Sequence, residues 1–279
     1  MRALAIVLLA LSVACGGGGT RLRSSGGGAS GAIDPAAFLV EVGATRTDML
    51  RADTRSIEEL ESARDAAQGA ERRRALIALA RAHMLEAGTS DDRAQRRHRS
   101  SAERFAEAAA NGSRDAELLA QSDFVPLWLA YRAGDRSAAG RAERFTTRRA
   151  QSGELALLGW VVRGEIAFAA EEWDAAAAAY RYVLGQLGHP LYAYSLYRTA
   201  QSHEGAGRAD DARTTLAEVA LLGCPADADE PTRRVALQAA RDLGTEVRRG
   251  ADGGERPASC PEPSSGGEST ESGEWRPAE

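Results

Sequence analysis

Residues 157–190 read LLGWVVRGEIAFAAEEWDAAAAAYRYVLGQLGHP, and this stretch decides the fold. Small and large side chains alternate along it at fixed spacings, at Trp160, Gly164, Ala167, Trp173, Ala176 and Tyr180. Small residues let two helices approach closely, while the large ones fill the space toward the next pair of helices. The acidic pair Glu171-Glu172 falls at the expected turn, near the N-terminus of the second helix. The stretch therefore predicts a pair of antiparallel helices.

Related units lie on both sides, about 36 residues apart. The following unit has small or apolar residues in the places of Gly164, Ala176 and Tyr180, namely Ala200, Ala212 and Leu216, with Gly207 at the turn. The preceding unit contains Trp128-Leu129-Ala130-Tyr131, then Gly134-Asp135 and Ala139. A weaker fourth unit joins Leu79–His83 to a helix around Ala102–Ala109. Residues 89–98 are longer than a repeat turn allows, so this unit carries an insertion or its register is shifted. A repeating helical architecture is expected.

The unit at 157–190 resembles the tetratricopeptide repeat (TPR), with an aromatic at position 4, Gly at 8, an aromatic near 17, Ala at 20 and an aromatic at 24. This resemblance implies an all-α, right-handed superhelical solenoid of antiparallel helix pairs. Recognisable repeats cover about 73–226 of a helical domain spanning 34–249. Helices near 34–43 and 55–70 would cap the front, and one at 230–248 the back. The alternative is a generic alanine-rich helical bundle.

Composition agrees with a helical fold and excludes some functions. Ala, Leu, Glu and Arg are strong helix formers, whereas the residues that favour strands are scarce. The formal net charge is -5, and the chain has no long basic block to neutralise a phosphate backbone. No nucleic-acid partner is therefore expected.

The N-terminus predicts export. Met1-Arg2 precedes an apolar run from Ala3 to Ala14, which is too short to span a bilayer but suits a signal peptide at 1–14. The run ends at Cys15 and resembles the lipobox of bacterial lipoproteins, although Ser12 stands where that family usually has Leu. The resemblance implies a lipid anchor on Cys15.

The same resemblance implies a location. Gly16 follows Cys15, which favours anchoring to the outer membrane facing the periplasm. Residues 15–33 would be a flexible, lipid-anchored Gly/Ser-rich linker, and the polar residues 250–279 a disordered tail. The alternative is ordinary secretory cleavage, giving a soluble periplasmic or secreted protein.

Two further cysteines, Cys224 and Cys260, each precede a proline. In an oxidising periplasm they could form a disulfide that pins the tail to the helical domain; otherwise they are two free thiols. The four histidines lie apart from one another in the sequence, and no metal-binding, nucleophile-elbow or phosphate-loop motif is present. No catalytic residue, metal or cofactor is predicted, and the chain is not expected to be an enzyme.

In the TPR family, the first helix of each repeat lines a concave binding groove. Carried over to this sequence, the exposed positions in that groove are Phe124, Trp128, Tyr131, Glu165, Phe168, Tyr194, Tyr197 and Gln201. This aromatic stripe suits an amphipathic helix or an extended peptide. The alternative is that these side chains are buried, since aromatic residues at helical spacing are more often core, and Trp160 and Trp173 are assigned to the core.

The expected function is a protein-binding scaffold or adaptor in an envelope complex, with a protein partner of unknown identity. The resemblance disfavours chaperone recognition, because the family's carboxylate-clamp residues do not occur at the matching positions. A small-ligand or glycan carrier is the alternative and would require a closed pocket with converging polar groups. An enzyme of an unrecognised type is the third possibility.

Overall fold

The computed structural model describes residues 33–88, 92–150, 153–225, 227–249 and 254–261. Within them, helices carry most of the chain and the strands form one two-stranded sheet, which confirms the predicted all-α class. The elements are α1 (Pro35–Arg46), η1 (a 3-10 helix, Asp48–Leu50), α2 (Ile57–Ala66), α3 (Gly69–Glu86), α4 (Asp92–Ala110), α5 (Ala116–Arg132), α6 (Ala138–Arg148), α7 (Gly153–Ala169), α8 (Trp173–Tyr180), α9 (Pro190–Gly205), α10 (Ala209–Leu221), α11 (Glu230–Asp242), β1 (Val247–Arg249) and β2 (Glu255–Pro257).

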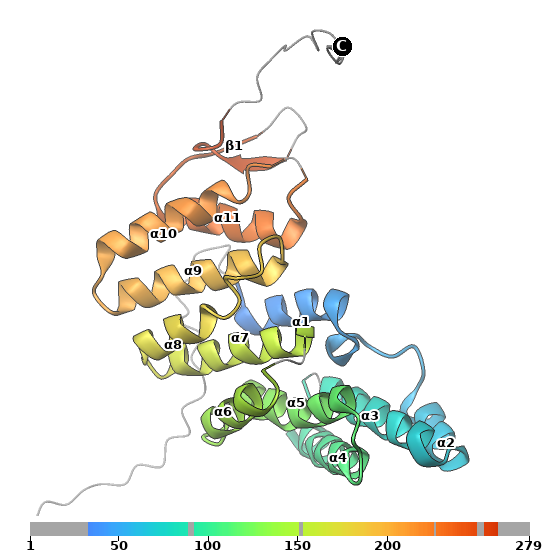
Figure 1. Ribbon diagram of the computed structural model, residues 1–279. Helices are drawn as coiled ribbons and strands as arrows, with labels where there is room; N and C mark the ends of the chain where they lie inside the picture. The colour runs from blue at the N-terminus through green and yellow to red at the C-terminus, as the bar shows by residue number, and fades with distance from the viewer. Residues whose placement is uncertain (1–32, 89–91, 151–152, 226, 250–253, 262–279) are drawn as a thin grey trace, which may run out of the picture.

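Two sets of contacts organise the helices. From α2 to α11, each helix contacts the helix that follows it in the sequence (Figure 1). In addition, α3 contacts α5, α5 contacts α7, α7 contacts α9, and α9 contacts α11. The helices α3, α5, α7, α9 and α11 therefore lie side by side and are called the odd-helix layer below. The helices α4, α6, α8 and α10 each pack against two members of that layer.

The members of the odd-helix layer from α5 onward end in the same way. The chain turns at a residue with positive φ, and the next backbone N–H donates to a carbonyl five residues earlier, as in a Schellman motif. These residues recur at intervals of 36 or 37 positions: Gly134 (φ 60), Glu171 (φ 60), Gly207 (φ 76) and Gly244 (φ 70). Three of the four are glycines because only glycine adopts this backbone region without strain.

Small residues mark the closest approaches between helices. A Cβ atom at Gly164 of α7 would lie 2.4 Å from the Tyr180 ring of α8, and one at Gly159 would lie 2.3 Å from Phe145 of α6. Gly205 of α9 lies in the same way against the indole of Trp173. The sequence predicts that Gly164 lies where two paired helices approach closely. The structure shows this contact between α7 and α8, which are joined by a turn.

Near the front of the chain, one pair of alternatives is resolved and one prediction is wrong. Of the two alternatives for residues 89–98, the insertion is wrong for residues 92–98 and the shifted register fits, because α4 begins at Asp92 and carries the basic run Arg96-Arg97-His98-Arg99 in its early turns. The helix expected near 34–43 exists as α1, but it does not cap the front. It instead lies against α7 in the middle of the molecule (Figure 1). The front of the helical series is α2 and α3, which divide the range predicted as one helix at 55–70.

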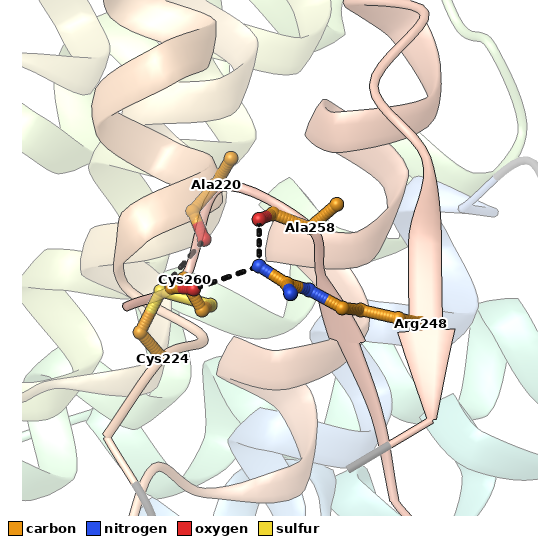
Figure 2. Close-up of a disulfide and its surroundings, with 5 residues drawn as sticks. All are labelled: Ala220, Cys224, Arg248, Ala258 and Cys260. Atoms are coloured by element: carbon orange, nitrogen blue, oxygen red, sulfur yellow. Dashed lines mark hydrogen bonds between the residues drawn. A yellow bond between two sulfur atoms is a disulfide. The ribbon is translucent and has the colours of Figure 1, made fainter. Parts of the chain in front are cut away.

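The predicted disordered tail also starts too early. Residues 255–257 form β2, which pairs antiparallel with β1 and places Val247 opposite Pro257. Cys224 and Cys260 are joined in a disulfide that ties this hairpin to the end of α10 (Figure 2). The Arg248 guanidinium donates to the backbone carbonyl oxygens of Ala258 and Cys260, at 3.2 Å for the latter. Residues 250–253 and 262–279 of the predicted tail lie outside the described residues.

Candidate functional site

The candidate site is the face of the odd-helix layer on which α1 lies. α1 begins where the Asp34 side chain accepts hydrogen bonds from the backbone N–H groups of Ala36 and Ala37, with Pro35 as the first helical residue. Its buried residues include Phe38, Leu39 and Val42, whose spacing places them on one side of the helix. α1 is therefore a short helix with a single apolar face.

Three members of the odd-helix layer hold α1. Backbone contacts join it to α7. The Phe38 ring stacks on Tyr194 of α9, with ring centroids 4.5 Å apart and an interplanar angle of 18°. The Arg234 guanidinium of α11 lies 5.5 Å from the Phe38 ring centroid, and its Nη2 lies 2.6 Å from Glu41 Oε2. The Arg234–Glu41 pair joins residues 193 positions apart, so α1 docks on helices from the opposite end of the sequence.

Most predicted groove residues are not exposed. The structure buries Phe124, Trp128, Tyr131, Glu165, Tyr194 and Tyr197, and it leaves Phe168 and Gln201 half-buried. The five aromatic side chains among the six buried residues are therefore core residues, which was the alternative to an open groove, and Glu165 is buried with them. Their contribution to partner binding stays a prediction. The physical reasons are two. α1 covers part of this face, and neighbouring aromatics pack on each other, as Phe124 and Trp128 do with centroids 5.9 Å apart.

Beneath α1 lies a buried carboxylate. Glu165 of α7 is 4 % exposed, and both of its oxygens are hydrogen-bonded. The hydroxyl groups of Tyr180 and Tyr194 donate to Oε1 at 2.8 and 2.9 Å. Arg198 of α9 donates to both oxygens, from Nε at 2.8 Å and from Nη2 at 2.7 Å. Its guanidinium also lies 3.6 Å from the Phe168 ring centroid. Glu165 thereby links α7, α8 and α9.

The hydrogen bonds continue from Arg198 to α11. Arg198 Nη1 donates to Gln201 Oε1 at 2.6 Å, and Gln201 Nε2 donates to the Tyr197 hydroxyl oxygen at 2.9 Å. Tyr197 in turn donates to Asp242 Oδ2 at 2.8 Å, and Gln238 donates to Asp242 Oδ1 at 2.8 Å. The structure therefore brings five predicted groove residues, Glu165, Phe168, Tyr194, Tyr197 and Gln201, to one cluster around Arg198.

The electrostatics of this cluster favour a structural role. Burial raises the pKa of Tyr180 and of Tyr194 well above the usual value, and the Glu165 charge raises both further. Burial lowers the pKa of Arg198, but Glu165, Tyr180 and Tyr194 together raise it by more, so the guanidinium stays charged. General acid–base catalysis works best with a pKa near the working pH, and these shifts lead away from neutrality. The cluster joins α7, α8, α9 and α11 through hydrogen bonds.

Two clefts adjoin α1. The larger, of about 960 Å³, is lined by residues from the end of α1, η1, the starts of α5 and α7, and the end of α6. Its charged lining residues are Arg46, Asp48, Arg51, Glu117, Arg148, Arg149 and Glu154. The smaller, of about 360 Å³, lies between Val40 of α1 and the predicted groove residue Trp128. α1 therefore leaves part of the face open to other molecules.

The histidines take part in local contacts. His83 and His98 share a hydrogen bond between their Nδ1 atoms at 2.9 Å, which joins α3 to α4. His189 caps α9, and its Nε2 lies 2.7 Å from Glu154 Oε2. His203 Nδ1 accepts from Arg208 Nε at 3.1 Å. Within the part of the chain that the structure describes, no three His, Cys, Asp or Glu side chains gather in a way that could hold a metal ion.

Trp160 and Trp173, assigned to the core from the sequence, are only half-buried. The Trp160 ring stacks on Tyr182 with centroids 3.6 Å apart, and Tyr182 is 59 % exposed. The Trp173 indole meets Phe168 edge-on, with centroids 5.0 Å apart. Trp160 packs on the turn that follows α8 and Trp173 packs on α7 and α9, both at the surface, so the assignment to the core is wrong.

The sequence patterns did not identify the residues that hold α1 in place, Phe38, Glu41 and Arg234, or the cation that pairs with Glu165, Arg198. Asp34-Pro35 indicates the start of a helix, but the neighbouring residues do not indicate where that helix packs. Arg198 has a local signal, since it follows Tyr194 by four residues and lies near it on the same face of α9.

Comparison with known proteins returns no matching family model, no matching curated protein and no matching solved structure. Among the described helices, none combines the length and the apolar character needed to cross a membrane.

Proposed function

We propose that this chain is a non-catalytic protein-binding scaffold or adaptor of the cell envelope, built as a TPR-like, right-handed solenoid of antiparallel helix pairs. The contacts between successive helices and between alternate helices support this architecture, because each unit of a solenoid touches chiefly its neighbours. The helix-ending turns at intervals of 36 or 37 residues support a repeat of that length. Gly164 against Tyr180 fits the close approach of paired helices that the TPR pattern requires.

One observation carries the functional part of the proposal: the odd-helix layer already holds a helix, α1. Phe38, Leu39 and Val42 supply the apolar contacts, and Glu41 pairs with Arg234. Helix-in-groove recognition uses this combination of an apolar face and flanking charge. The natural partner is therefore a protein that presents a helix or a peptide to the same face.

The location is proposed from the N-terminus and from one bond. The lipobox-like sequence ending at Cys15 indicates lipid anchoring to the outer membrane facing the periplasm, although Cys15 lies outside the described residues. The Cys224–Cys260 disulfide agrees with an oxidising compartment. A soluble periplasmic or secreted protein is the alternative location.

Site-specific photo-crosslinking in intact cells tests the proposal. A photoreactive residue at Glu117, which lines the larger cleft, should give one discrete, saturable protein adduct. The matched control is Arg144, an exposed residue of α6 that does not line the cleft, and it should give no such adduct. Equal labelling from both positions, or no adduct from Glu117, would refute a partner site on this face.

The volume of the larger cleft favours a second candidate function, a periplasmic small-ligand or glycan-binding lipoprotein. About 960 Å³ lies within the range of small-molecule sites, and charged groups of both signs line it. Native mass spectrometry of the chain purified from its own host separates the two functions. A stoichiometric small molecule together with no protein adduct at Glu117 would favour the second.

A further inference from the structure

The position of α1 sets it apart from the other helices. From α2 onward each helix contacts the helix that follows it, whereas α1 contacts the short η1 and then α7, although α2 is the next α-helix in the chain. Between α1 and α2 lie η1 and residues 51–56, which form no helix. The contacts from α2 to α11 do not pass through α1. They are made among the helices of the series themselves.

Besides packing on η1, α1 is held against the odd-helix layer by contacts of two kinds. One kind is apolar, with Phe38 on Tyr194 and with Leu39 and Val42 buried. The other is a single ion pair between Glu41 and Arg234, whose side chains are 45 % and 41 % exposed. An ion pair this exposed adds little affinity, but it fixes the register and direction of the helix. The site that α1 occupies, called the seat below, therefore selects a helix with an aromatic residue followed by an acidic residue three positions later.

We propose that α1 is a displaceable internal ligand, and that the partner supplies a helix with the same pattern of Phe, Leu, Glu and Val at relative positions 1, 2, 4 and 5. This inference rests on the proposed function, and it adds the partner's chemistry and the control of access. While α1 is seated, it covers Tyr194 and engages Arg234. The two clefts lined by α1 and η1 are surfaces beside α1 that a partner can contact before α1 is displaced.

Because α1 is covalently joined to the helices that it contacts, it competes strongly with a free helix for the same site. A segment joined to its site by a short linker acts at an effective concentration of roughly millimolar. A free helix at micromolar concentration therefore binds poorly while α1 can return to its seat. A partner must bind more tightly than α1, or α1 must be held away by what lies before it in the chain. Residues before Ile33 lie outside the described residues, and the proposal depends on none of them.

A fluorescent peptide of residues 33–47, IDPAAFLVEVGATRT, tests the proposal by anisotropy on the full chain in detergent. Phe38→Asp in the chain places a charge against Tyr194 and should unseat α1. We expect the peptide to bind this variant at least ten times more tightly than it binds the wild-type chain. Gly43→Val is a second way to unseat α1, because a Cβ there would lie 2.5 Å from Leu50 Cδ1. It should act in the same direction if Phe38→Asp does not fold.

A charge exchange provides the matched control. In the Phe38→Asp chain, Arg234→Glu should weaken binding of the peptide about three- to fivefold, and a peptide carrying Glu41→Arg should regain that loss. Equal affinity for the wild-type and variant chains, or binding to no folded variant, would overturn the proposal. So would a dimer of the wild-type chain that exchanges α1 between two copies, because the seat would then belong to a second copy.

Hydrogen exchange on the unmodified chain gives a readout that needs no variant. The backbone amides of α1 should exchange at least ten times faster than those of α7 and α9, because α1 opens locally without unfolding the series. Exchange of α1 as slow as that of α9 would overturn the proposal. A Glu117 adduct that the peptide does not displace would leave the scaffold function standing and remove this inference alone.

Discussion

The contact between Glu165 and Arg198 is the most consequential one at the scale of single residues. Both side chains are largely shielded from water, with 3 % and 11 % exposed, and their two hydrogen bonds are short. A buried ion pair gains little over apolar packing, but removing one partner leaves an uncompensated buried charge. The pair therefore makes the α7–α9 contact specific and intolerant of single substitutions.

Glu165→Gln should lower the free energy of unfolding by about 3–5 kcal/mol, because it leaves the buried Arg198 cation without a counter-charge. Urea denaturation followed by circular dichroism measures this loss. Glu41→Gln is the matched control, since its pair with Arg234 is exposed and should contribute about 1 kcal/mol or less. Equal losses for the two variants would contradict the account.

Glu171 offers a substitution in the opposite direction. It is the one non-glycine residue with positive φ among the residues that the structure describes, and it occupies the place that Gly134, Gly207 and Gly244 hold in the other turns. Left-handed backbone costs a non-glycine residue about 1–2 kcal/mol. Glu171→Gly should therefore raise the free energy of unfolding by about 1 kcal/mol, as measured by thermal and urea unfolding. A loss of stability would show that the Glu171 side chain has a role of its own.

The His83–His98 contact makes stability depend on pH. Burial lowers the pKa of His83, and the neighbouring His98 and Arg104 lower it further, while Glu61 and Glu86 act in the opposite direction. The unfolded chain then binds a proton more readily than the folded chain does. The contribution of neutral His83 to the free energy of unfolding is present above about pH 6.5, the ordinary pKa of histidine. It is lost as the pH falls below that value.

We therefore expect the free energy of unfolding to fall between pH 7.5 and pH 5. The fall should be smaller in His83→Gln than in the wild-type chain, as measured by urea denaturation at each pH. His203→Gln serves as the control and should keep the wild-type fall, since His203 lies against Arg208 on another helix pair. An unchanged fall in His83→Gln would exclude this histidine as the cause.

At the scale of the elements, helix pairs depend on glycine at their closest contacts. Gly164→Ala should lower the free energy of unfolding by about 1–3 kcal/mol, because the added Cβ would lie 2.4 Å from the buried Tyr180 ring. Gly140→Ala on α6 is the control. Its Cβ would meet only the Arg144 guanidinium, at 3.5 Å, and alanine favours a helix by about 1 kcal/mol. Differential scanning calorimetry should show opposite shifts in Tm.

Local pattern predicted the elements well where small and aromatic residues recur, as in α7 and α8. It was less successful at α4, where residues 89–98 left two alternatives open, an insertion or a shifted register. Charged residues on the solvent side of an amphipathic helix are ordinary, and α4 is strongly amphipathic, with Ala102, Phe105, Ala106 and Ala109 buried. It failed at Trp160 and Trp173, because periodicity does not reveal which face a later helix will cover.

At the scale of the whole molecule, the sequence could not reveal where α1 docks. The existence of a helix near 34–43 follows from local signals, but Phe38 meets Tyr194 across more than half of the chain. A contact between residues so far apart in the chain produces no periodic pattern in a single sequence, so it cannot be predicted from spacing. The predicted groove residues lie on α5, α7 and α9 and include several members of the Glu165 cluster, but the sequence did not indicate that α1 packs on the same face.

Locking α1 in place tests the central claim most directly. In a Glu41→Cys, Arg234→Cys chain, a bismaleimide should join the two new thiols, because the original side chains lie 2.6 Å apart and Cys224 is already bonded to Cys260. We predict that the linked chain loses the partner adduct from a photoreactive residue at Glu117, while the unlinked chain retains it. An adduct of undiminished yield from the linked chain would contradict the claim that α1 and the partner compete for one face.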